Sequence, residues 1–380
     1  MFKKLLTSKR DYSGIISSLL AIFIGLLVGF IVLAIVKPSA CIKGFKLLLT
    51  GGFFQGLTTF GSVFFYATPL ILCGLGDAFA FKASIFNIGG PGQMHLGALA
   101  SVWVTYNLYN AFQLPGLLCV IAGLLSGAIV GALWALIPAL LNAYRRVNII
   151  ITTIMMNYIG MYLAVYLLKL SNIYDPTKNQ NKTLPKEIRF PRFGLDKIFK
   201  GSAVDGGIIV VSIIAIILWL ILEKTTFGYE IKAVGKNRDA ADYAGINAKR
   251  TIVISVLVSG ALIGLGGGFM YLGWAGKHLV GSNTQLGEGF TGIAVTMLAT
   301  NNPIGCIFAG FFLAYLTESG SFMQTVGYAP EIVKVISSVI IYCSALSLLV
   351  SEYIRKKKLD YMAGITNDPN VKRLGKGGKE

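Results

Sequence analysis

The chain has 380 residues, of which 54% are hydrophobic and only 13% are charged, and it carries a net charge of +17. Soluble domains contain about 25% charged residues, and a soluble fold of this length could not bury so much apolar surface. The composition therefore excludes a soluble globular protein. In a membrane protein the positive excess indicates topology and contact with anionic lipid rather than nucleic acid.

The fold class predicted from the apolar stretches is an all-α integral membrane protein with about ten transmembrane helices. A helix of about 20 apolar residues crosses the hydrocarbon core. In chain order the predicted spans are 14–36, 58–80, 88–108, 115–141, 149–170, 207–223, 252–273, 286–300, 304–321 and 331–353. The first is expected to be a retained helix, because its apolar run is longer than the 7–15 residues of a signal peptide.

Basic clusters set the expected orientation, because Lys and Arg gather on the cytoplasmic side. Both termini are then cytoplasmic. The chain divides into a cytoplasmic N-terminus (1–13), a transmembrane domain (14–353) and a basic cytoplasmic tail (354–380). Within the domain, 171–206 is an external loop, although it is basic, and 224–250 is a cytoplasmic loop.

Two predicted spans are short and follow Gly-rich polar turns, at 87–93 and 281–289. They are second in two groups of four spans that begin on opposite sides of the membrane. Such interrupted helices at matching positions indicate an inverted repeat and the transport pathway. Other glycine runs, such as 123–131 and 264–268, are interpreted as helix packing.

Polar side chains at membrane depth are expensive and mark candidate pathway residues. The candidates are Asn87, Gln93, His95, Asn157 and Glu288. Each has a structural alternative: a hydrogen-bonded packing role for the first four, and a solvated loop end for Glu288. Asp77 and Lys82 are a further possible pair at the end of the second span.

The residues for other chemistry are missing. There is no Gly-rich phosphate loop followed by Lys-Ser or Lys-Thr, and only two histidines, His95 and His278, are present. The five cysteines are scattered without metal-type or redox-type spacing. We therefore expect no catalytic residues, no metal site and no cofactor.

The loop 224–250 has the pattern of a short capped helix. Asn237 can cap it and Asp239 lies in its first turn, where a negative charge is favourable. Gly245 can end it at the C′ position. Three alanines, Ala240, Ala241 and Ala244, give it a small-residue face that could sit in a groove.

Five segments carry a resemblance to a known family, at 84–100, 148–158, 226–247, 289–294 and 302–305. They are similar to permease subunits of ABC importers of the branched-chain amino acid, simple-sugar and nucleoside group. The Met-Met-Asn-Tyr element at 155–158 and the Asn-Asn-Pro turn at 301–303 resemble the nucleoside branch most. Pro91 and His95 depart from the family pattern.

The resemblance implies an importer driven by a separate cytoplasmic ATP-binding subunit in a bacterial cell membrane. It also implies a second, related permease subunit and an extracytoplasmic substrate-binding lipoprotein. The segment that couples to the ATPase would include Gly235, Asn237, Asp239, Ala240, Ala241, Asp242 and Gly245. The alternatives are a simple-sugar permease, an ion-coupled secondary transporter and a membrane-embedded enzyme.

Overall fold

A computed structural model describes residues 13–329, 331, 332, 334–340, 342 and 343. These residues are mainly helical. The helices are α2 (Ser13–Val36), α3 (Cys41–Thr50), α4 (Leu57–Lys82), α5 (Gly90–Phe112), α6 (Gly116–Arg145), α7 (Ile149–Leu170), α8 (Leu195–Ile198), α9 (Gly207–Lys224), α10 (Thr226–Lys236), α11 (Arg238–Tyr243), α12 (Ala248–Leu272), α13 (Gly287–Leu298) and α14 (Pro303–Met323). The strands β1 (Tyr174–Asp175) and β2 (Gln180–Asn181) form one antiparallel hairpin. Single 3-10 turns lie at Pro38–Ala40, Gly51–Phe53, Lys186–Ile188 and Gln324–Val326.

Seven helices of the described part are long and apolar enough to cross a membrane, by length and composition: α2, α4, α6, α7, α9, α12 and α14. They correspond to seven of the ten predicted spans. The other three are α5, the 12-residue α13 and the predicted span 331–353, which lies largely outside the described residues. The all-α membrane fold is therefore confirmed. The segments 1–12 and 354–380 also lie outside the described residues.

One expectation about an individual helix was wrong. The third predicted span is not short, because α5 continues for 23 residues after its Gly-rich start. The connection between the first two spans contains α3, a helix whose lysines Lys43 and Lys46 interrupt the apolar pattern. Of the two helices expected to be short, only α13 is.

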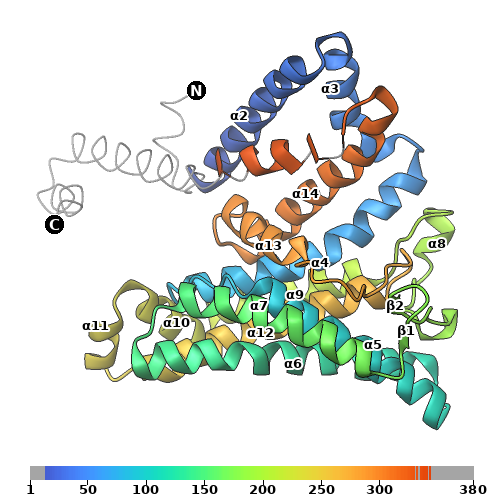
Figure 1. The fold of residues 1–380 in the computed structure, drawn as a ribbon. Coiled ribbons are helices and arrows are strands. Elements are labelled where there is room, and N and C mark those ends of the chain that lie inside the picture. Colours follow the sequence, from blue (N-terminus) through green and yellow to red (C-terminus); the bar gives the residue numbers. More distant parts are fainter. Residues whose placement is uncertain (1–12, 330, 333, 341, 344–380) are drawn as a thin grey trace, which may run out of the picture.

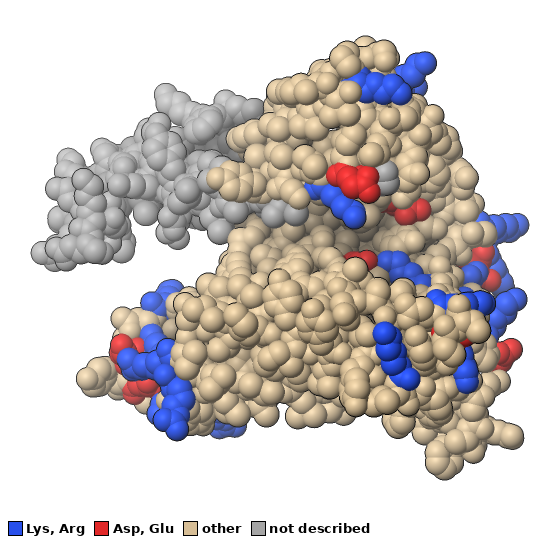
Figure 2. Space-filling view, viewed as in Figure 1, with Lys and Arg blue, Asp and Glu red and all other residues tan. Residues whose placement is uncertain are grey.

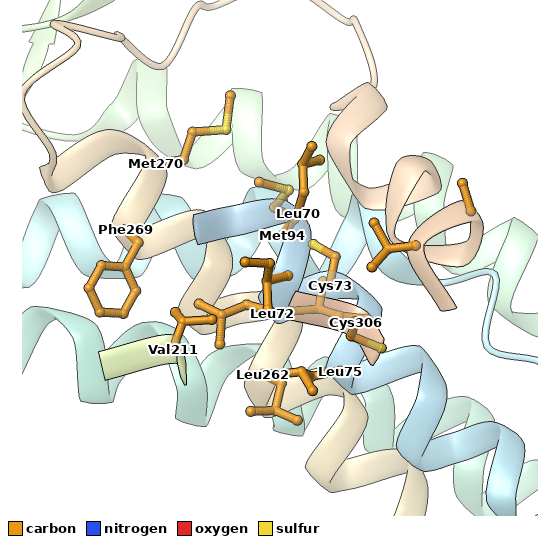
Figure 3. Packing of buried hydrophobic residues seen from close by; sticks show 14 of the residues in the cluster. Leu70, Leu72, Cys73, Leu75, Met94, Val211, Leu262, Phe269, Met270 and Cys306 are labelled. Atoms are coloured by element: carbon orange, nitrogen blue, oxygen red, sulfur yellow. The ribbon is translucent and has the colours of Figure 1, made fainter. Parts of the chain in front are cut away.

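The helices form two groups that share α4 (Figure 1). In the first group α12 packs against α6, α5 and α4, and α7 packs against α5. In the second, α14 packs against α4 and α3, and α13 against α4. Because α4 lies between the groups, 89% of the residues in its most apolar stretch are buried inside the protein. Leu70, Leu72 and Leu75 of this helix meet side chains from α9, α12 and α14 in the core (Figure 3).

Glycines allow α12 and α6 to approach each other closely. A Cβ atom added at Gly264 would lie 2.3 Å from the carbonyl oxygen of Gly127, and one at Gly131 would lie 2.3 Å from that of Gly260. These distances leave no room for any side chain. Small residues bring membrane helices into backbone contact, so the packing interpretation of these glycine runs is confirmed.

The 171–206 loop is folded against the end of α12. Trp274 donates a hydrogen bond from Nε1 to the carbonyl oxygen of Phe190, at 2.7 Å. The Arg192 guanidinium lies over the same indole, 4.0 Å from the ring centroid. At the end of the loop, Asp205 Oδ1 accepts a hydrogen bond from the Gly207 N–H at the start of α9, at 2.9 Å. The loop therefore links the ends of two membrane helices.

We expect this loop to make stability depend on pH. Burial raises the pKa of the Asp205 carboxyl from its ordinary value to about 7, against the opposing effects of Gly207 N–H and Arg192. The folded protein thus holds a proton that the unfolded chain releases near pH 4, so stability falls as pH rises from about 4 to about 7. The thermal midpoint of purified protein should be higher at pH 5 than at pH 8.

The variant Asp205→Asn keeps the acceptor for Gly207 N–H and removes the titration, so its midpoint should change less between pH 5 and pH 8. Asp175→Asn is the matched control. Asp175 is only partly buried, and its hydrogen bond from Thr177 lowers its pKa, so it stays ionised throughout this range. An Asp205→Asn profile as steep as that of the unmodified protein would contradict the assignment.

Candidate functional site

The break between α4 and α5, at 83–89, is held by buried amide side chains. Asn87 Nδ2 donates to Gln93 Oε1 at 3.1 Å and to Ser259 Oγ of α12 at 2.9 Å. Asn87 Oδ1 accepts from the Gly89 N–H at 3.0 Å. Non-helical backbone at membrane depth needs such protein partners, because lipid offers none.

Asn157 of α7 holds the same break from the other side. Its Oδ1 accepts from the Gly92 N–H at 3.0 Å, and its Nδ2 donates to the carbonyl oxygen of Ile88 at 2.6 Å. One side chain therefore satisfies a donor at the start of α5 and an acceptor in the break. The side chain is 2% exposed.

The pathway prediction for Asn87, Gln93 and Asn157 has to be set against these bonds. The structure brings the three amides together and buries them, and protein groups hydrogen-bond to each one. In this conformation their hydrogen bonds hold the start of α5 against α7 and α12. That they also meet a transported solute stays a prediction.

Replacing Asn157 with leucine should destabilise the protein. The change leaves the Gly92 N–H and the Ile88 carbonyl without their partner, and each buried unpaired polar group costs about 1–3 kcal/mol. The expected result is a clear fall in the thermal midpoint in detergent. Asn110→Ala is the control, because Asn110 makes one exposed bond within its own helix, to Tyr106. Equal midpoints for both variants would contradict the role of Asn157.

The helices that follow the two Gly-rich turns meet at their N-terminal ends. A Cβ atom added at Gly90 of α5 would lie 2.6 Å from the carbonyl oxygen of Gly289 of α13. Glu288 lies in the first turn of α13, and its carboxylate accepts from Lys277 Nζ at 3.0 Å. The two turns that the sequence singled out therefore meet at one place in the fold.

His95 is the predicted pathway residue that lines a cavity. The cavity measures about 90 Å³ and lies between α5, α7, α12 and the segment 279–286, with Tyr271 on its wall. Its volume corresponds to about three water molecules at about 30 Å³ each, whereas ligand sites measure about 300–1,000 Å³. In this conformation the cavity is therefore smaller than a typical ligand site.

Asp77 of α4 is a buried carboxyl beside α13. It is 1% exposed, and neither oxygen has a hydrogen-bond partner among the described residues. A Cβ atom added at Gly292 would lie 3.1 Å from Asp77 Oδ2. The pair with Lys82 that the sequence allowed does not form among the described residues.

The segment 224–250 folds as two short helices at one end of the molecule, α10 and α11 (Figure 1). Asn237 is the N-cap of α11, and its side chain accepts from the Ala240 N–H at 2.9 Å. Asp239 lies in the first turn, and Gly245 follows the helix with φ +83°. The capped helix predicted from the sequence is confirmed.

The small-residue face of α11 differs from the expected one. Ala241 is buried against the rest of the protein, while Ala240 and Ala244 are exposed. Tyr243, which the sequence analysis did not single out, is 95% exposed on the same helix. The exposed surface of α11 and its C-cap therefore combines two alanines, a projecting aromatic ring and the carboxylates of Asp239 and Asp242.

Three contacts tie α10 and α11 to membrane helices. Ser84 Oγ, just after α4, donates to the Gly235 carbonyl oxygen at 2.5 Å. Arg238 Nη2 donates to the Ala143 carbonyl oxygen near the end of α6, at 2.6 Å. Asp242 Oδ1 accepts from the N–H of the first residue of α12, at 3.0 Å. A displacement of α10 and α11 together would therefore act on the ends of α4, α6 and α12.

A groove of about 710 Å³ opens beside α11, between α10 and the end of α4. Its wall carries three lysines, Lys82, Lys232 and Lys236, together with Gly235, Asn237, Ala240 and Ala244. Charged residues of both signs gather at this end of the molecule, while the surface over the middle of the helices is almost uncharged (Figure 2). This end is polar enough to lie outside the bilayer.

The chain thus combines a multi-pass helical body, a break between two helices in its interior and a helical block at one end, an architecture that fits a membrane transport component. The sequence model of one protein family, the permease component of branched-chain amino acid transport systems, matches residues 59–345. The chain belongs to this family and is a permease component of an ABC transport system rather than an enzyme.

Relatives with known solutes are similar to most of the chain. The nucleoside ABC transporter permease NupB of Lactococcus lactis is 36% identical, over 76% of this chain and 80% of its own length. The guanosine ABC transporter permease NupP of Bacillus subtilis is 33% identical, over 92% and 98%. The glucose ABC transporter permease TsgB13 of Haloferax volcanii is 32% identical, over 80% and 78%. No solved structure gives a significant match.

Proposed function

We propose that the chain is a permease subunit of an ABC importer for nucleosides in a bacterial cell membrane. The observation that carries this proposal is the 33% identity to a guanosine permease over nearly the full length of both chains. A second nucleoside permease, NupC of Lactococcus lactis, is 32% identical over 67% of this chain. The expected solute is therefore a nucleoside.

In this proposal the membrane domain has ten spans in two inverted groups of four, preceded by one span in each half. Seven helices of sufficient length and the meeting of α5 with α13 support the arrangement. Inverted repeats place the solute site near the bilayer midplane, at the interface between the repeats. Both chain termini and the segment 224–250 then face the cytoplasm, and the 171–206 loop faces outward.

The proposed coupling element is α11, which contains Asp239 and Asp242, together with the flanking residues Gly235, Asn237 and Gly245. Its exposed Ala240 and Ala244 are small enough for the helix to fit into a groove of the ATP-binding subunit. Tyr243 projects beside them and would anchor the contact, since tyrosines often contribute most of the binding energy of an interface. The bonds from this block to α4, α6 and α12 support transmission of movement into the membrane.

The proposed partners follow from the transport cycle. Closure of a cytoplasmic ATP-binding subunit would push α11, and the membrane helices would then alternate between outward-open and inward-open arrangements. A related second permease would complete the membrane unit, and an extracytoplasmic lipoprotein would deliver the solute. Anionic lipid would contact the basic end of the chain.

Radiolabelled uptake tests the function. A deletion strain should lose guanosine uptake, and a plasmid copy of the chain should restore it. Depletion of ATP with the proton gradient intact should abolish the restored uptake. Uptake that survives ATP depletion would instead indicate an ion-coupled transporter.

A simple-sugar permease is the second candidate, and the glucose permease relative favours it. The same strain distinguishes the two. Excess unlabelled uridine should compete with labelled guanosine, whereas excess ribose or glucose should not. Competition by a free sugar, with labelled sugar taken up at a comparable rate, would replace the nucleoside assignment.

A further inference from the structure

The helix α7 exposes a row of tyrosines that runs from the middle of its length toward its C-terminal end. Tyr158, Tyr162 and Tyr166 are 52%, 54% and 61% exposed. Residues four apart lie on the same face of a helix, so the three rings form one ladder with a rise of about 6 Å per step. None of the three hydroxyls has a hydrogen-bond partner among the residues that the structure describes.

The neighbouring helices show what a lipid-facing surface of this protein looks like. The exposed row of α6, with the same spacing of four, is Leu117, Ile121, Leu125, Ile129, Leu133, Ile137 and Leu141. The exposed apolar face of α9 consists of Ile209, Ile213, Ile216, Ile217 and Leu220. These faces carry only aliphatic side chains and suit lipid tails. On α7 the tyrosines lie among exposed apolar side chains such as Met155 and Ile159, and only their rings and hydroxyls distinguish this face from the other two.

Lipid is a poor neighbour for Tyr158 and Tyr162 because of their depth. The 22 residues of α7 span about 33 Å, and Tyr162 lies about 20 Å from the start, close to the centre of the bilayer. Tyrosines of membrane proteins gather at the two water interfaces instead. A hydroxyl without a partner costs about 4–8 kcal/mol in a medium that cannot hydrogen-bond.

Rotation of α7 cannot hide the rings, because the opposite face of the helix is fixed. Asn157 is bonded to both sides of the break before α5. Trp134 Nε1 of α6 donates to the Met156 carbonyl oxygen at 3.2 Å. A Cβ atom added at Gly160 would lie 3.0 Å from the Cα of Gly92. The ladder therefore keeps its outward direction.

The surface over α7 borders a hollow in the molecule. Figure 2, in the same view as Figure 1, shows the protein hollowed between the part that contains α7 and the part formed by α2, α3 and α14. The surface over the middle of α7 is uncharged in this view. Water in such a hollow would satisfy the hydroxyls without requiring charged side chains.

We propose that the ladder of Tyr158, Tyr162 and Tyr166 lines the solute pathway and stacks against the base of a nucleoside as it crosses the membrane. The proposal rests on the proposed function for its choice of solute. A tyrosine ring offers a flat face to any base, and such stacking contributes about 1–3 kcal/mol per base. Three similar rings would give three successive sites of similar, weak affinity, so that a nucleoside could move from one ring to the next.

Cysteine labelling in native membranes, with the complete transporter present, tests the proposal. Tyr162→Cys should react with a small, charged, membrane-impermeant methanethiosulfonate at least about tenfold faster than Leu133→Cys, because the thiolate needs water. Leu133 lies on the aliphatic row of α6 and is the matched control. The native cysteines set the background, and Cys41, Cys73, Cys119 and Cys306 are buried.

Guanosine should slow the labelling of Tyr162→Cys. Labelling as slow as at Leu133→Cys, in membranes whose unmodified transporter takes up guanosine, would overturn the pathway assignment and indicate lipid or a protein contact. Fast labelling that guanosine does not slow would overturn the stacking. Protection by glucose alone, with no guanosine uptake by the unmodified chain, would overturn the nucleoside function instead.

Side-chain replacement gives an independent measure. Changing all three tyrosines to leucine should lower the maximal rate of uptake by about tenfold, as expected from the loss of one stacking interaction. Changing all three to phenylalanine, which keeps the rings, should lower it less. Amounts of each variant in the membrane are measured alongside. Equal losses in the two variants would contradict base stacking.

Discussion

Uptake should fall at least about tenfold when Gly245 is replaced by valine, while the amount of protein in the membrane stays the same. Gly245 has φ +83°, a conformation that costs a side chain about 1–2 kcal/mol and a β-branched one more. In this turn the N–H of Ile246 donates to the Ala241 carbonyl oxygen at 3.0 Å. Relief of the strain would break that bond and reorient α11.

The control separates backbone strain from bulk. No atom lies within 4 Å of a Cβ added at Gly245, so a side chain itself meets no obstacle. Asparagine adopts positive φ more readily than other residues, so Gly245→Asn should keep more uptake than Gly245→Val. Normal uptake in Gly245→Val would count against α11 as the coupling element, whereas equal loss in both variants would point to the side chain rather than the turn.

The largest loss of stability is expected from Gly264→Leu. A Cβ atom at this position would lie 2.3 Å from the Gly127 carbonyl oxygen and 2.9 Å from the Cα of Gly131, both backbone atoms of α6. Neither can move without separating two helices along their length. Overpacking costs about 1–3 kcal/mol even where side chains can adapt, so we expect little folded Gly264→Leu protein in the membrane.

Gly287→Ala is the matched control, because no atom lies within 4 Å of a Cβ added there. Its amount in the membrane and its thermal midpoint in detergent should match those of the unmodified chain. A Gly264→Leu protein with an unchanged midpoint would show that α6 and α12 are not in backbone contact.

Local patterns predicted the membrane body and the short capped helix. Long aliphatic runs such as 115–141 leave only a spanning helix, because each backbone polar group must be satisfied within the segment. The signals for α11 are equally local: an Asn that accepts from the backbone two or three residues later, and a Gly whose φ is positive. Neighbouring chain segments are not needed to read either signal.

Hydropathy does not predict the features that depend on tertiary contacts. The segment that forms α3 contains two lysines, and its packing against α14 is a contact between distant parts of the chain. The direction of Ala241 depends on how α11 is tied to α6 and α12. The spacing of Tyr158, Tyr162 and Tyr166 is visible in the sequence, but only the structure shows which face of α7 is covered.

The sequence by itself determined that this chain lies in a membrane, carries no phosphate-binding loop and presents one capped polar helix, since these properties depend on composition and short-range hydrogen bonds. Only the tertiary structure decided what the polar residues of the interior do. Asn87, Gln93 and Asn157 look alike as candidates in the sequence, yet they hydrogen-bond to groups up to 172 positions away in the chain. Whether a buried amide is satisfied depends on those distant partners, and no local pattern encodes them.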